Sequence, residues 1–430
     1  MSLPRFFTRQ VQLFLRPHTK TINANCSIVR QPAKRFHSTR VNKDKSCVLA
    51  YFIAGGLAFF ISGDNLYSWY VNRGYERRLD ETMEKGTRPE NDTSDGESVS
   101  RPLMVDRLKK VFQPYKNQSY YHMVCGEHGT GKTRLIRISA NEVGQGVIYV
   151  DVPANSNLNL FGDALGKALN YFDKHVPYSK RLVRKLFSAS ESVKEPKWVR
   201  ATDAFKRSAE KYKAKYGKPP VIIYDNVSRL ITAHPEVLDI LQDDANDNAD
   251  DKKYITVLVC SGGNVPRRME SRSSWSRAKK PVIEIGDLNK EESMYYLINE
   301  RKINFVDAKR LYDLVGGRIM ELKNVADDFL AGQTFEVIKQ QVFGTIYDNF
   351  EMAEMNPSQS NHEAAKIIIR TLLNSNDMLH ISMLRELTNV EPNKLLEGNV
   401  FAYHPEHKAV TFISRSVESY VQENATKFIK

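Results

Sequence analysis

Eight consecutive residues, Gly126 to Thr133, have the types and spacing that phosphate binding requires, G-x-x-x-x-G-K-T. Glycines let successive backbone N–H groups turn toward a triphosphate, and the helix N-terminus that follows adds partial positive charge. Lys132 would reach the β- and γ-phosphate oxygens, and Thr133 would hold Mg²⁺. We therefore predict a site for ATP and Mg²⁺. The residues expected to surround the nucleotide are Gly126, Glu127, His128, Gly129, Thr130, Gly131, Lys132, Thr133 and Arg134.

The segments on both sides of this loop favour phosphate binding over a glycine-rich turn that matches by chance. Residues 120–124 are apolar or aromatic enough to form a strand, and residues 134–138 begin a helical pattern. The loop therefore lies in the strand–loop–helix context in which such loops bind phosphate.

ATP hydrolysis also needs an acid that holds Mg²⁺ and a base for the attacking water. The apolar run 221–224 ends in Asp225, a Walker B arrangement in which Asp225 would hold Mg²⁺ through its water shell. The next residue, Asn226, can orient a water but cannot accept its proton, and general-base catalysis is worth roughly 10²–10⁴-fold. Either hydrolysis is slow, or another acid such as Glu127 or Asp151 contributes. We favour slow, switch-like turnover.

Further candidates follow the later strands. Ser261, just beyond the apolar run 255–259, is positioned to touch the γ-phosphate or its water. The segment 265–277 contains four arginines, and a guanidinium delivered to a neighbouring subunit's nucleotide would stabilise the transferring charge. Arg272 and Arg277 are the preferred candidates for such an arginine finger, which implies a homo-oligomer. A solvated basic helix is the alternative.

Alternating apolar strands and helices must position these residues. Strands are expected over 120–124, 146–152, 221–224, 255–259 and 281–285, with helices between them. This alternation predicts an α/β fold in which helices cover both faces of a parallel sheet. We expect the strand ending at Cys125 to lie between those at Val259 and Ile283, because a phosphate-loop strand usually lies in the middle of its sheet. Cys125 and Cys260 should then be close.

Beyond the sheet the pattern becomes helical. Residues 287–358 predict a helical lid, and residues 359–430 have the helix and strand order of a winged helix. The presumptive recognition helix, 391–397, has two acids and one lysine. DNA-contacting elements normally have clustered positive charge, so nucleic-acid binding remains an alternative that we do not favour.

The first hundred residues differ in composition. Residues 1–45 have ten Lys or Arg against one acid, the pattern of a mitochondrial presequence, with a disordered basic arm as the alternative. Residues 46–72 include an uncharged run and an aromatic group. Since a bilayer needs ~20 apolar residues, we predict one transmembrane helix here, in the inner mitochondrial membrane, with a buried core helix as the alternative. Residues 73–100 are expected to be a disordered linker.

Net charge and cysteines narrow the possible functions. Residues 1–45 supply nine of the twelve net positive charges, so the charge does not imply a nucleic-acid surface on the rest of the chain. The four cysteines, Cys26, Cys47, Cys125 and Cys260, lack the spacing of a metal site or a disulfide framework.

These features together resemble the AAA+ and STAND-type P-loop ATPases, and most closely the archaeal and origin-recognition-like members. The resemblance covers 101–430, and it implies an ATPase core over 101–286, a lid over 287–358 and a winged helix over 359–430. It rests on 126–133, 221–225, Ser261, the arginine-rich segment, 286–292 and the terminal elements. Asn226 departs from the family, which usually has an acid here. Gly316, Gly317 and Arg318 approximate a sensor-2 motif, in which Arg318 would contact the γ-phosphate.

The leading hypothesis is a membrane-anchored mitochondrial ATPase with slow turnover. Its nucleotide state would set the angle between core and lid, as in a switch or a remodelling factor. The alternatives are a DNA-binding winged-helix module and a scaffold that binds ATP without hydrolysing it.

Overall fold

The computed structural model describes residues 43–90, 99, 101–155, 157–187, 195–374 and 378–428. Most of the expected presequence and part of the expected linker therefore lie outside the described residues. The chain divides into two units, residues 1–60 and residues 61–430. The central sheet, the region expected as a lid and the C-terminal region all belong to the second unit.

Five parallel strands form the central sheet. They are β1 (His122–Cys125), β2 (Val147–Asp151), β3 (Val221–Asp225), β4 (Ile255–Val259) and β5 (Ile283–Glu284), in the order β2-β3-β4-β1-β5. Val124 pairs with Val259 on one side and with Ile283 on the other, as the sequence predicts. The N–H of Cys260 donates to the Val124 carbonyl at 3.0 Å, which brings Cys260 next to the end of β1. The predicted parallel sheet is confirmed, with the strand that ends at Cys125 between those at Val259 and Ile283.

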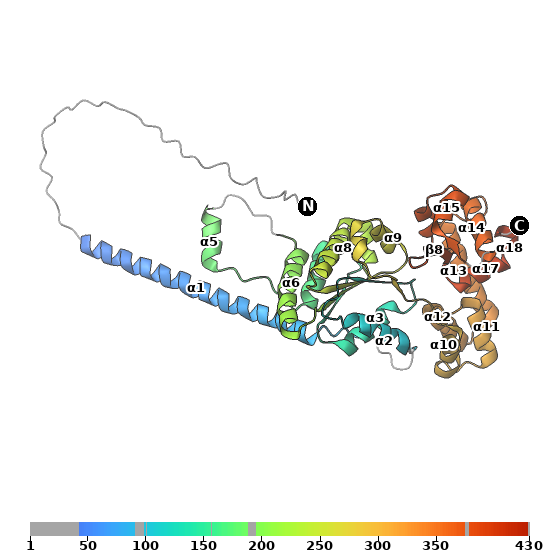
Figure 1. Ribbon diagram of the computed structural model, residues 1–430, viewed down its shortest axis with the longest axis horizontal. Helices are drawn as coiled ribbons and strands as arrows, with labels where there is room; N and C mark the ends of the chain where they lie inside the picture. Colours follow the sequence, from blue (N-terminus) through green and yellow to red (C-terminus); the bar gives the residue numbers. More distant parts are fainter. Residues whose placement is uncertain are drawn as a thin grey trace, which may run out of the picture. The chain divides into compact units, whose positions relative to one another are not determined.

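The strands are apolar on both faces because helices cover both faces (Figure 1). Val124, Ile223 and Val257 pack with α2 (Pro102–Phe112) and α3 (Lys132–Val143). Their neighbours in sequence point the other way and join the core formed with α4 (Leu158–Ala168), α6 (Lys197–Tyr216) and α8 (Pro235–Asp250). Each fully buried aliphatic side chain stabilises the fold by ~1.5–3 kcal/mol, so the two layers hold the carboxyl edge of the sheet in place.

The segment expected to cross a membrane belongs to one long helix, α1 (Lys43–Lys85). Among the described residues no helix is long and apolar enough to cross a membrane, so the prediction for 46–72 is not supported. From residue 64 onward α1 has polar side chains that face protein: Asp64 Oδ2 accepts from the Ser179 N–H at 2.7 Å, and Ser68 Oγ lies 2.9 Å from the His175 ring.

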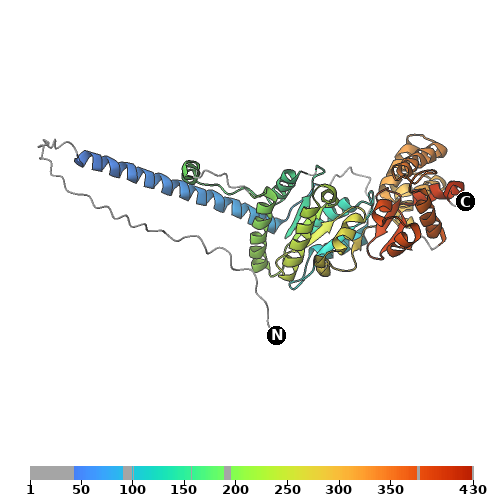
Figure 2. The same cartoon turned by 90° about the horizontal axis from the view of Figure 1, so that it is seen from above.

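The expected linker is also helical over its first part. Residues 73–85 continue α1, and Leu79 and Met83 are buried in the core of the sheet domain. Asp80 accepts from Ser208 and from Lys211, at 2.7 and 2.8 Å, which ties α1 to α6. The polar composition of this segment indicated disorder, but its apolar residues at helical spacing pack against protein. Figure 2 shows the end of α1 beside the sheet domain.

The remaining helices of the sheet domain are short. They are α5 (Tyr178–Phe187), α7 (Ser228–Ala233), α9 (Asn264–Glu270) and the 3₁₀ helix Ser273–Arg277. Beyond the sheet domain, helices predominate. The region expected as a lid contains α10 (Lys290–Tyr295), the π-helical turn Tyr296–Glu300, α11 (Phe305–Val315), α12 (Ile319–Leu330) and α13 (Phe335–Met352).

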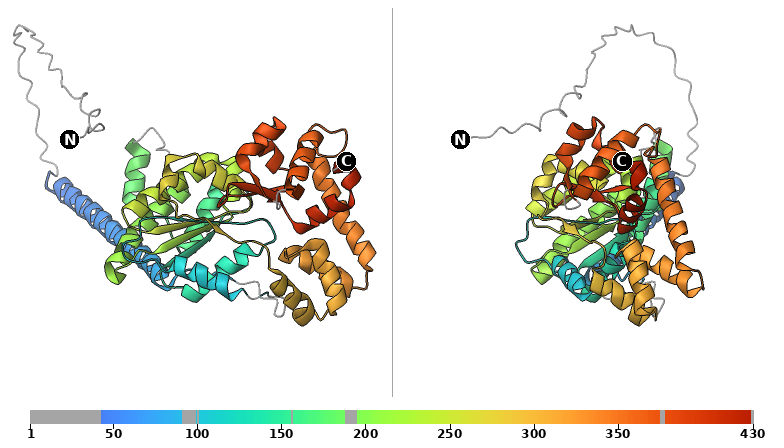
Figure 3. Two further views of the ribbon diagram at one scale, coloured as in Figure 1. Left: turned by 45° about the vertical axis from the view of Figure 1, so that its right-hand side comes forward. Right: turned by 90° about the vertical axis from the view of Figure 1, so that its right-hand side faces the viewer.

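The C-terminal region, orange to red in Figure 3, combines helices with a small antiparallel sheet. Its helices are α14 (His362–Asn374), α15 (Ile381–Thr388), α16 (Pro392–Leu396), α17 (Arg415–Glu423) and α18 (Ala425–Phe428). Its strands are β6 (Leu379–His380), β7 (Phe401–His404) and β8 (Ala409–Phe412), in the order β6-β8-β7. The region therefore contains both helices and strands, and the winged helix expected over 359–430 stays a prediction.

Candidate nucleotide site

The loop between β1 and α3 has a backbone that only glycine adopts easily. Gly126, Gly129 and Gly131 have φ values of +154°, +80° and +84°. A Cβ on Gly126 would lie 2.2 Å from the Ile285 carbonyl oxygen, which leaves no room for a side chain. The loop therefore packs its backbone against the end of β5, at the carboxyl edge where open α/β sheets bind ligands.

Lys132 is folded back onto this loop. Its Nζ donates to the Glu127 carbonyl at 2.6 Å, and Thr130 Oγ1 donates to the same oxygen at 2.9 Å. Lys132 is only 7% exposed, and this burial lowers its pKa. A phosphate would offer this buried ammonium group a charged acceptor in place of a neutral carbonyl, so Lys132 fits the role of a nucleotide ligand.

Thr133 and Asp225 together fit a Mg²⁺ ion. The Thr133 hydroxyl is hydrogen-bonded to the Asp225 carboxylate, and Tyr149 donates to Asp225 Oδ2 at 2.8 Å. Asp225 is 1% exposed, and burial raises its pKa although these hydrogen bonds lower it. Magnesium prefers oxygen ligands, and a bound divalent cation would offset the cost of this buried carboxylate.

Asn226 is turned toward a neighbouring acid. Its φ is +63°, and its Nδ2 donates to Asp151 Oδ1 at 2.8 Å. Asp151 also forms ion pairs with Arg137 and Arg229, each at 3.2 Å. Both oxygens of Asp151 are therefore engaged by cationic partners within the chain. Of the two substitute bases that the sequence suggested, Asp151 already has partners.

Glu127, the other suggested base, lies within the phosphate loop. Burial raises its pKa, while Arg318 and Lys132 act in the opposite direction. Together with Thr130 and Arg318 it lines a cavity of about 280 Å³ that extends to β8 and α17 of the C-terminal region. Glu127 is therefore placed beside the site with a raised proton affinity, which suits a general base.

Arg318 reaches the same loop from the region expected as a lid. The Met320 N–H, near the start of α12, donates to the Gly129 carbonyl at 3.2 Å. Arg318 is buried, and its guanidinium pairs with Asp287 at 3.1 Å and donates to the Ile413 carbonyl. A sensor of the γ-phosphate must lie beside the phosphate loop, and Arg318 does. Its guanidinium is engaged by one partner that follows β5 and by another that follows β8.

Ser261 also lies near the loop through its backbone. Its N–H donates to Ser228 Oγ at 2.8 Å, and the next residue, Gly262, donates to the Gly126 carbonyl at 3.0 Å. These bonds fix the turn after β4 directly against the phosphate loop, so Ser261 is in the region that the sequence predicts.

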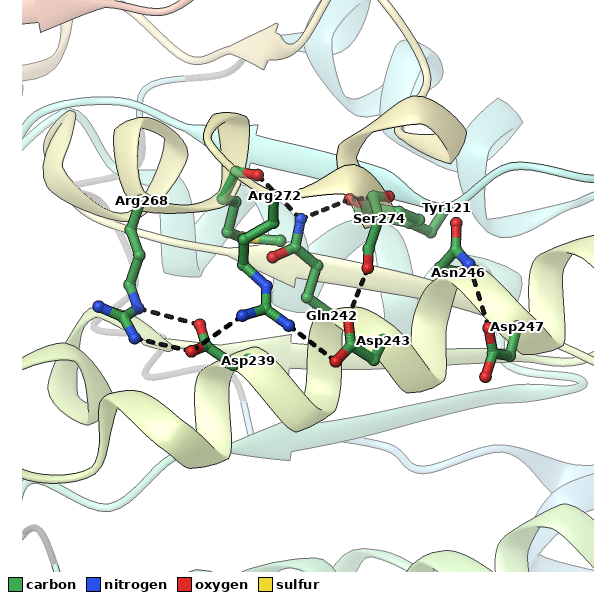
Figure 4. Close-up of polar contacts among 10 residues, drawn as sticks. Tyr121, Asp239, Gln242, Asp243, Asn246, Asp247, Arg268, Arg272 and Ser274 are labelled. Atoms are coloured by element: carbon green, nitrogen blue, oxygen red, sulfur yellow. Dashed lines mark hydrogen bonds and ion pairs between the residues drawn. The ribbon is translucent and has the colours of Figure 1, made fainter. Parts of the chain in front are cut away.

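Arg272 and Arg277 do not join this site, and Figure 4 shows Arg272 with its acidic partners on α8. Arg272 pairs with Asp239 at 3.1 Å and with Asp243 at 2.7 Å, and Arg277 pairs with Asp250; all three acids are on α8. The Arg277 carbonyl accepts from the N–H of Tyr121, just before β1. Arg277 thus lies at the amino edge of the sheet, opposite the phosphate loop. The action of Arg272 or Arg277 on a neighbouring subunit stays a prediction.

Sequence reasoning missed three polar partners of the site. Tyr149 supports Asp225, Asp287 holds Arg318, and Glu284 lies against His404 of β7. A tyrosine inside an aliphatic parallel strand was a usable signal for the first. The other two depend on how distant segments meet, which spacing along one chain does not reveal.

Comparison with known proteins places the core in one family. Residues 100–325 match the family model of an ATPase domain found predominantly in Archaea. No curated protein matches the chain.

Solved structures with a similar fold are distant. A Walker-type ATPase of Pyrococcus abyssi is 14% identical, with 78% of this chain and 98% of that chain covered and a TM-score of 0.49. Cdc6p from Pyrobaculum aerophilum is 12% identical, with 79% of this chain and 100% of that chain covered and a TM-score of 0.39. AMPPCP-bound DnaA from Aquifex aeolicus is 13% identical, with 71% of this chain and 87% of that chain covered and a TM-score of 0.34. At these values the similarity assigns no function.

Proposed function

Because the chain belongs to the family of ATPase domains found predominantly in Archaea, we propose that it binds ATP with Mg²⁺, hydrolyses it slowly and works as a nucleotide-dependent switch or remodelling factor. One observation supports the proposal: the residues that would bind phosphate and Mg²⁺ lie together, whereas the position of the usual base holds Asn226, which donates a hydrogen bond to Asp151.

Binding would rest on side chains that already converge. Lys132 and the loop amides would hold the phosphates, and Thr133 with Asp225 would hold Mg²⁺, which supplies charge neutralisation when bound. Both Lys132 and Asp225 are buried without a full counter-charge, so ligand binding relieves an existing electrostatic cost.

Slow turnover follows from the proton-transfer groups. Asn226 has no titratable group, and Asp151 is engaged by Arg137 and Arg229. Of the two acids that the sequence suggested as a base, Glu127 remains. If Glu127 does not reach the water, the protein lacks a contribution of roughly 10²–10⁴-fold.

The switch would act through contacts that the lid region and the core make with the C-terminal region, which we propose to be a winged helix. Arg318 donates to the Ile413 carbonyl beside β8, and Tyr403 of β7 donates to Glu270 at 3.2 Å. Tyr403 also lies so close to Gly263 that a Cβ there would be 2.6 Å from it. A γ-phosphate competing for Arg318 would weaken the first of these contacts, so nucleotide binding would loosen the C-terminal region from the site.

Location and assembly are part of the same proposal. The basic, acid-poor residues 1–45 support import into mitochondria, and an import assay with and without these residues tests this. Assembly into a homo-oligomer, with Arg272 or Arg277 acting on a neighbour, rests on the arginine-rich segment alone.

Nucleotide binding and phosphate release by the full chain test the proposal, with Lys132→Ala as the reference for loss of binding. We expect Mg²⁺-dependent ATP binding, turnover at or below the ~1 s⁻¹ lower end of typical enzymes, and no effect of duplex DNA. Fast turnover by the isolated monomer would contradict the switch. Binding without release would identify a scaffold, and stimulation by DNA would identify a DNA-binding module.

A further inference from the structure

Helix α5 is amphipathic, yet its apolar half is exposed. Leu182, Val183 and Leu186 are 58%, 57% and 67% exposed, and Tyr178 lies on the same half of the helix. Packing normally buries such a face, since each leucine or valine gains ~1.5–3 kcal/mol on leaving water. Tyr178 contacts His175 at one end of this half, but Leu182, Val183 and Leu186 stay exposed, so the structure leaves most of an apolar helix face in water.

The opposite half of α5 is entirely basic. Lys180, Arg181, Arg184 and Lys185 occupy it, and the helix contains no acid. None of these four side chains is in an ion pair that the structure records, whereas many lysines and arginines elsewhere in the described chain are paired. The helix therefore combines an exposed apolar half with four basic groups on the other half.

Residues 61–72 of α1 hold α5 in place and extend its surface. Asp64 Oδ2 accepts from both the N–H and the hydroxyl of Ser179, at 2.7 and 2.8 Å, and Asn72 Oδ1 accepts from the His175 N–H at 2.6 Å. In Figures 1 and 2, α5 lies beside α1, apart from α6 and α8.

The exposed side of the same part of α1 is aromatic. Leu66, Tyr67, Trp69 and Tyr70 are all more than half exposed, and Arg73 lies over the Trp69 ring at 5.3 Å. Tryptophan and tyrosine favour the head-group level of membranes, where one end of the ring is apolar and the other is wet.

We propose that α5 and the aromatic side of residues 66–70 form a docking surface for an anionic phospholipid membrane. The apolar half of α5 would enter the boundary between head groups and acyl chains, with the basic residues toward the lipid phosphates. An anionic surface is favoured over a neutral one because α5 has four basic residues and no acid. The helix would lie in the plane of the membrane without crossing it, and this surface is independent of the nucleotide site.

Vesicle binding by the full chain gives the first measure. Leu182→Ser/Leu186→Ser should weaken binding to phosphatidylcholine vesicles containing phosphatidylserine by about 10- to 100-fold. The matched control is Leu103→Ser/Leu330→Ser, which removes two exposed leucines away from α5 and should bind as the wild type does. Lys132→Ala should also bind normally.

A probe on α5 makes the test decisive, because the uncharged run 46–63 could itself bind lipid. An environment-sensitive fluorophore on Val183→Cys, in a Cys26→Ser/Cys47→Ser background, should shift to shorter wavelength and be quenched by nitroxide lipids when phosphatidylserine is present. The same probe on Arg184→Cys, on the basic half, should stay in water. Cys125 and Cys260 are buried and should not be labelled.

Three results would overturn the proposal. The chain could pellet with vesicles while the probe at position 183 stays in water, which would assign lipid binding to another segment. The probe could respond equally to pure phosphatidylcholine, which would remove the role of the basic half. It could also shift without vesicles as protein concentration rises, which would mean that a second copy of the chain covers α5.

Discussion

Charged residues in two regions of this protein are placed under opposite conditions. In the nucleotide site, Lys132 and Asp225 are almost fully buried and no counter-charge matches them completely. In the α8 ion-pair cluster, Arg268, Arg272 and Arg277 pair with Asp239, Asp243 and Asp250 in partly exposed positions. Figure 4 shows the pairs that Arg268 and Arg272 make. Burial makes each charge in the first region costly until a ligand binds, whereas solvent screens the second.

The difference teaches that charge content alone does not identify a functional site. From sequence, the arginines near Arg272 looked as promising as the residues of the phosphate loop. The structure separates the two sets by burial and by partner. The arginines near Arg272 are neutralised by acids within the chain, and the buried charges of the nucleotide site are not. Substitutions in the two regions should therefore have effects of very different size.

The largest effect is expected from Lys132→Ala, which removes the buried cation that would face the phosphates. Hydrogen bonds to charged groups contribute ~1.5–3 kcal/mol, so ATP should bind ~10- to 150-fold more weakly. The matched control is Lys109→Ala, which breaks a partly exposed ion pair with Glu142 of α3 and should leave binding unchanged. Equal affinities for wild type and Lys132→Ala, measured by calorimetry, would remove the nucleotide site.

Asn226→Glu should have the next largest effect, this time a gain. If a missing base limits turnover, phosphate release should rise toward the ~10²-fold lower end of general-base contributions while ATP affinity hardly changes. The new carboxylate would face Asp151, but Arg137 and Arg229 lie close enough to offset that repulsion. Unchanged slow turnover with unchanged binding would show that Glu127 or subunit assembly sets the rate.

Asp225→Asn should separate function from stability. Burial raises the pKa of Asp225 above its unfolded value, so the folded state keeps a proton that the unfolded chain loses first. The free energy of unfolding therefore falls as pH rises from the pKa of Asp225 in the unfolded chain to its higher pKa in the folded state. At neutral pH the buried, ionised carboxylate destabilises the folded protein.

The variant should consequently have a Tm a few degrees higher without nucleotide, at ~2–4 °C per kcal/mol, and a flatter dependence of Tm on pH. It should also lose the Mg²⁺ dependence of ATP binding. Thermal denaturation scans from acidic to neutral pH measure the first effect. A lower Tm throughout would mean that the hydrogen bonds from Tyr149 and Thr133 outweigh the burial cost.

Local patterns in the sequence predicted the sheet, because a strand buried on both faces reads as an unbroken apolar run and glycines mark the phosphate loop. They failed where distant segments decide the outcome. Residues 73–85 have a polar composition, but Leu79 and Met83 find a core to pack against. Arg277 looked free in the sequence, but the turn of chain before β5 brings it to Asp250. Partners of that kind depend on tertiary packing.

Arg272→Ala should have the smallest effect and is the sharpest test of the cluster. Arg272 bridges Asp239 and Asp243, but these pairs are partly exposed, and such pairs contribute ~0.2–1 kcal/mol each, so the variant should lose only a degree or two of Tm. An isolated chain should hydrolyse ATP at the wild-type rate, since Arg272 does not lie in its own nucleotide site.

If Arg272 instead acts on a neighbouring subunit, the rate of Arg272→Ala should drop only at concentrations where the chain assembles. Mixing the Arg272→Ala and Lys132→Ala variants distinguishes an action on a neighbour from a structural role. In the mixture, Lys132→Ala subunits would supply the arginine, and Arg272→Ala subunits would supply the intact nucleotide site. Recovery of activity in the mixture would show that an intramolecular ion pair opens on assembly and would end the contrast between the two regions. A rate that is the same in the variant, the wild type and the mixture at every concentration would leave the cluster with a structural role alone.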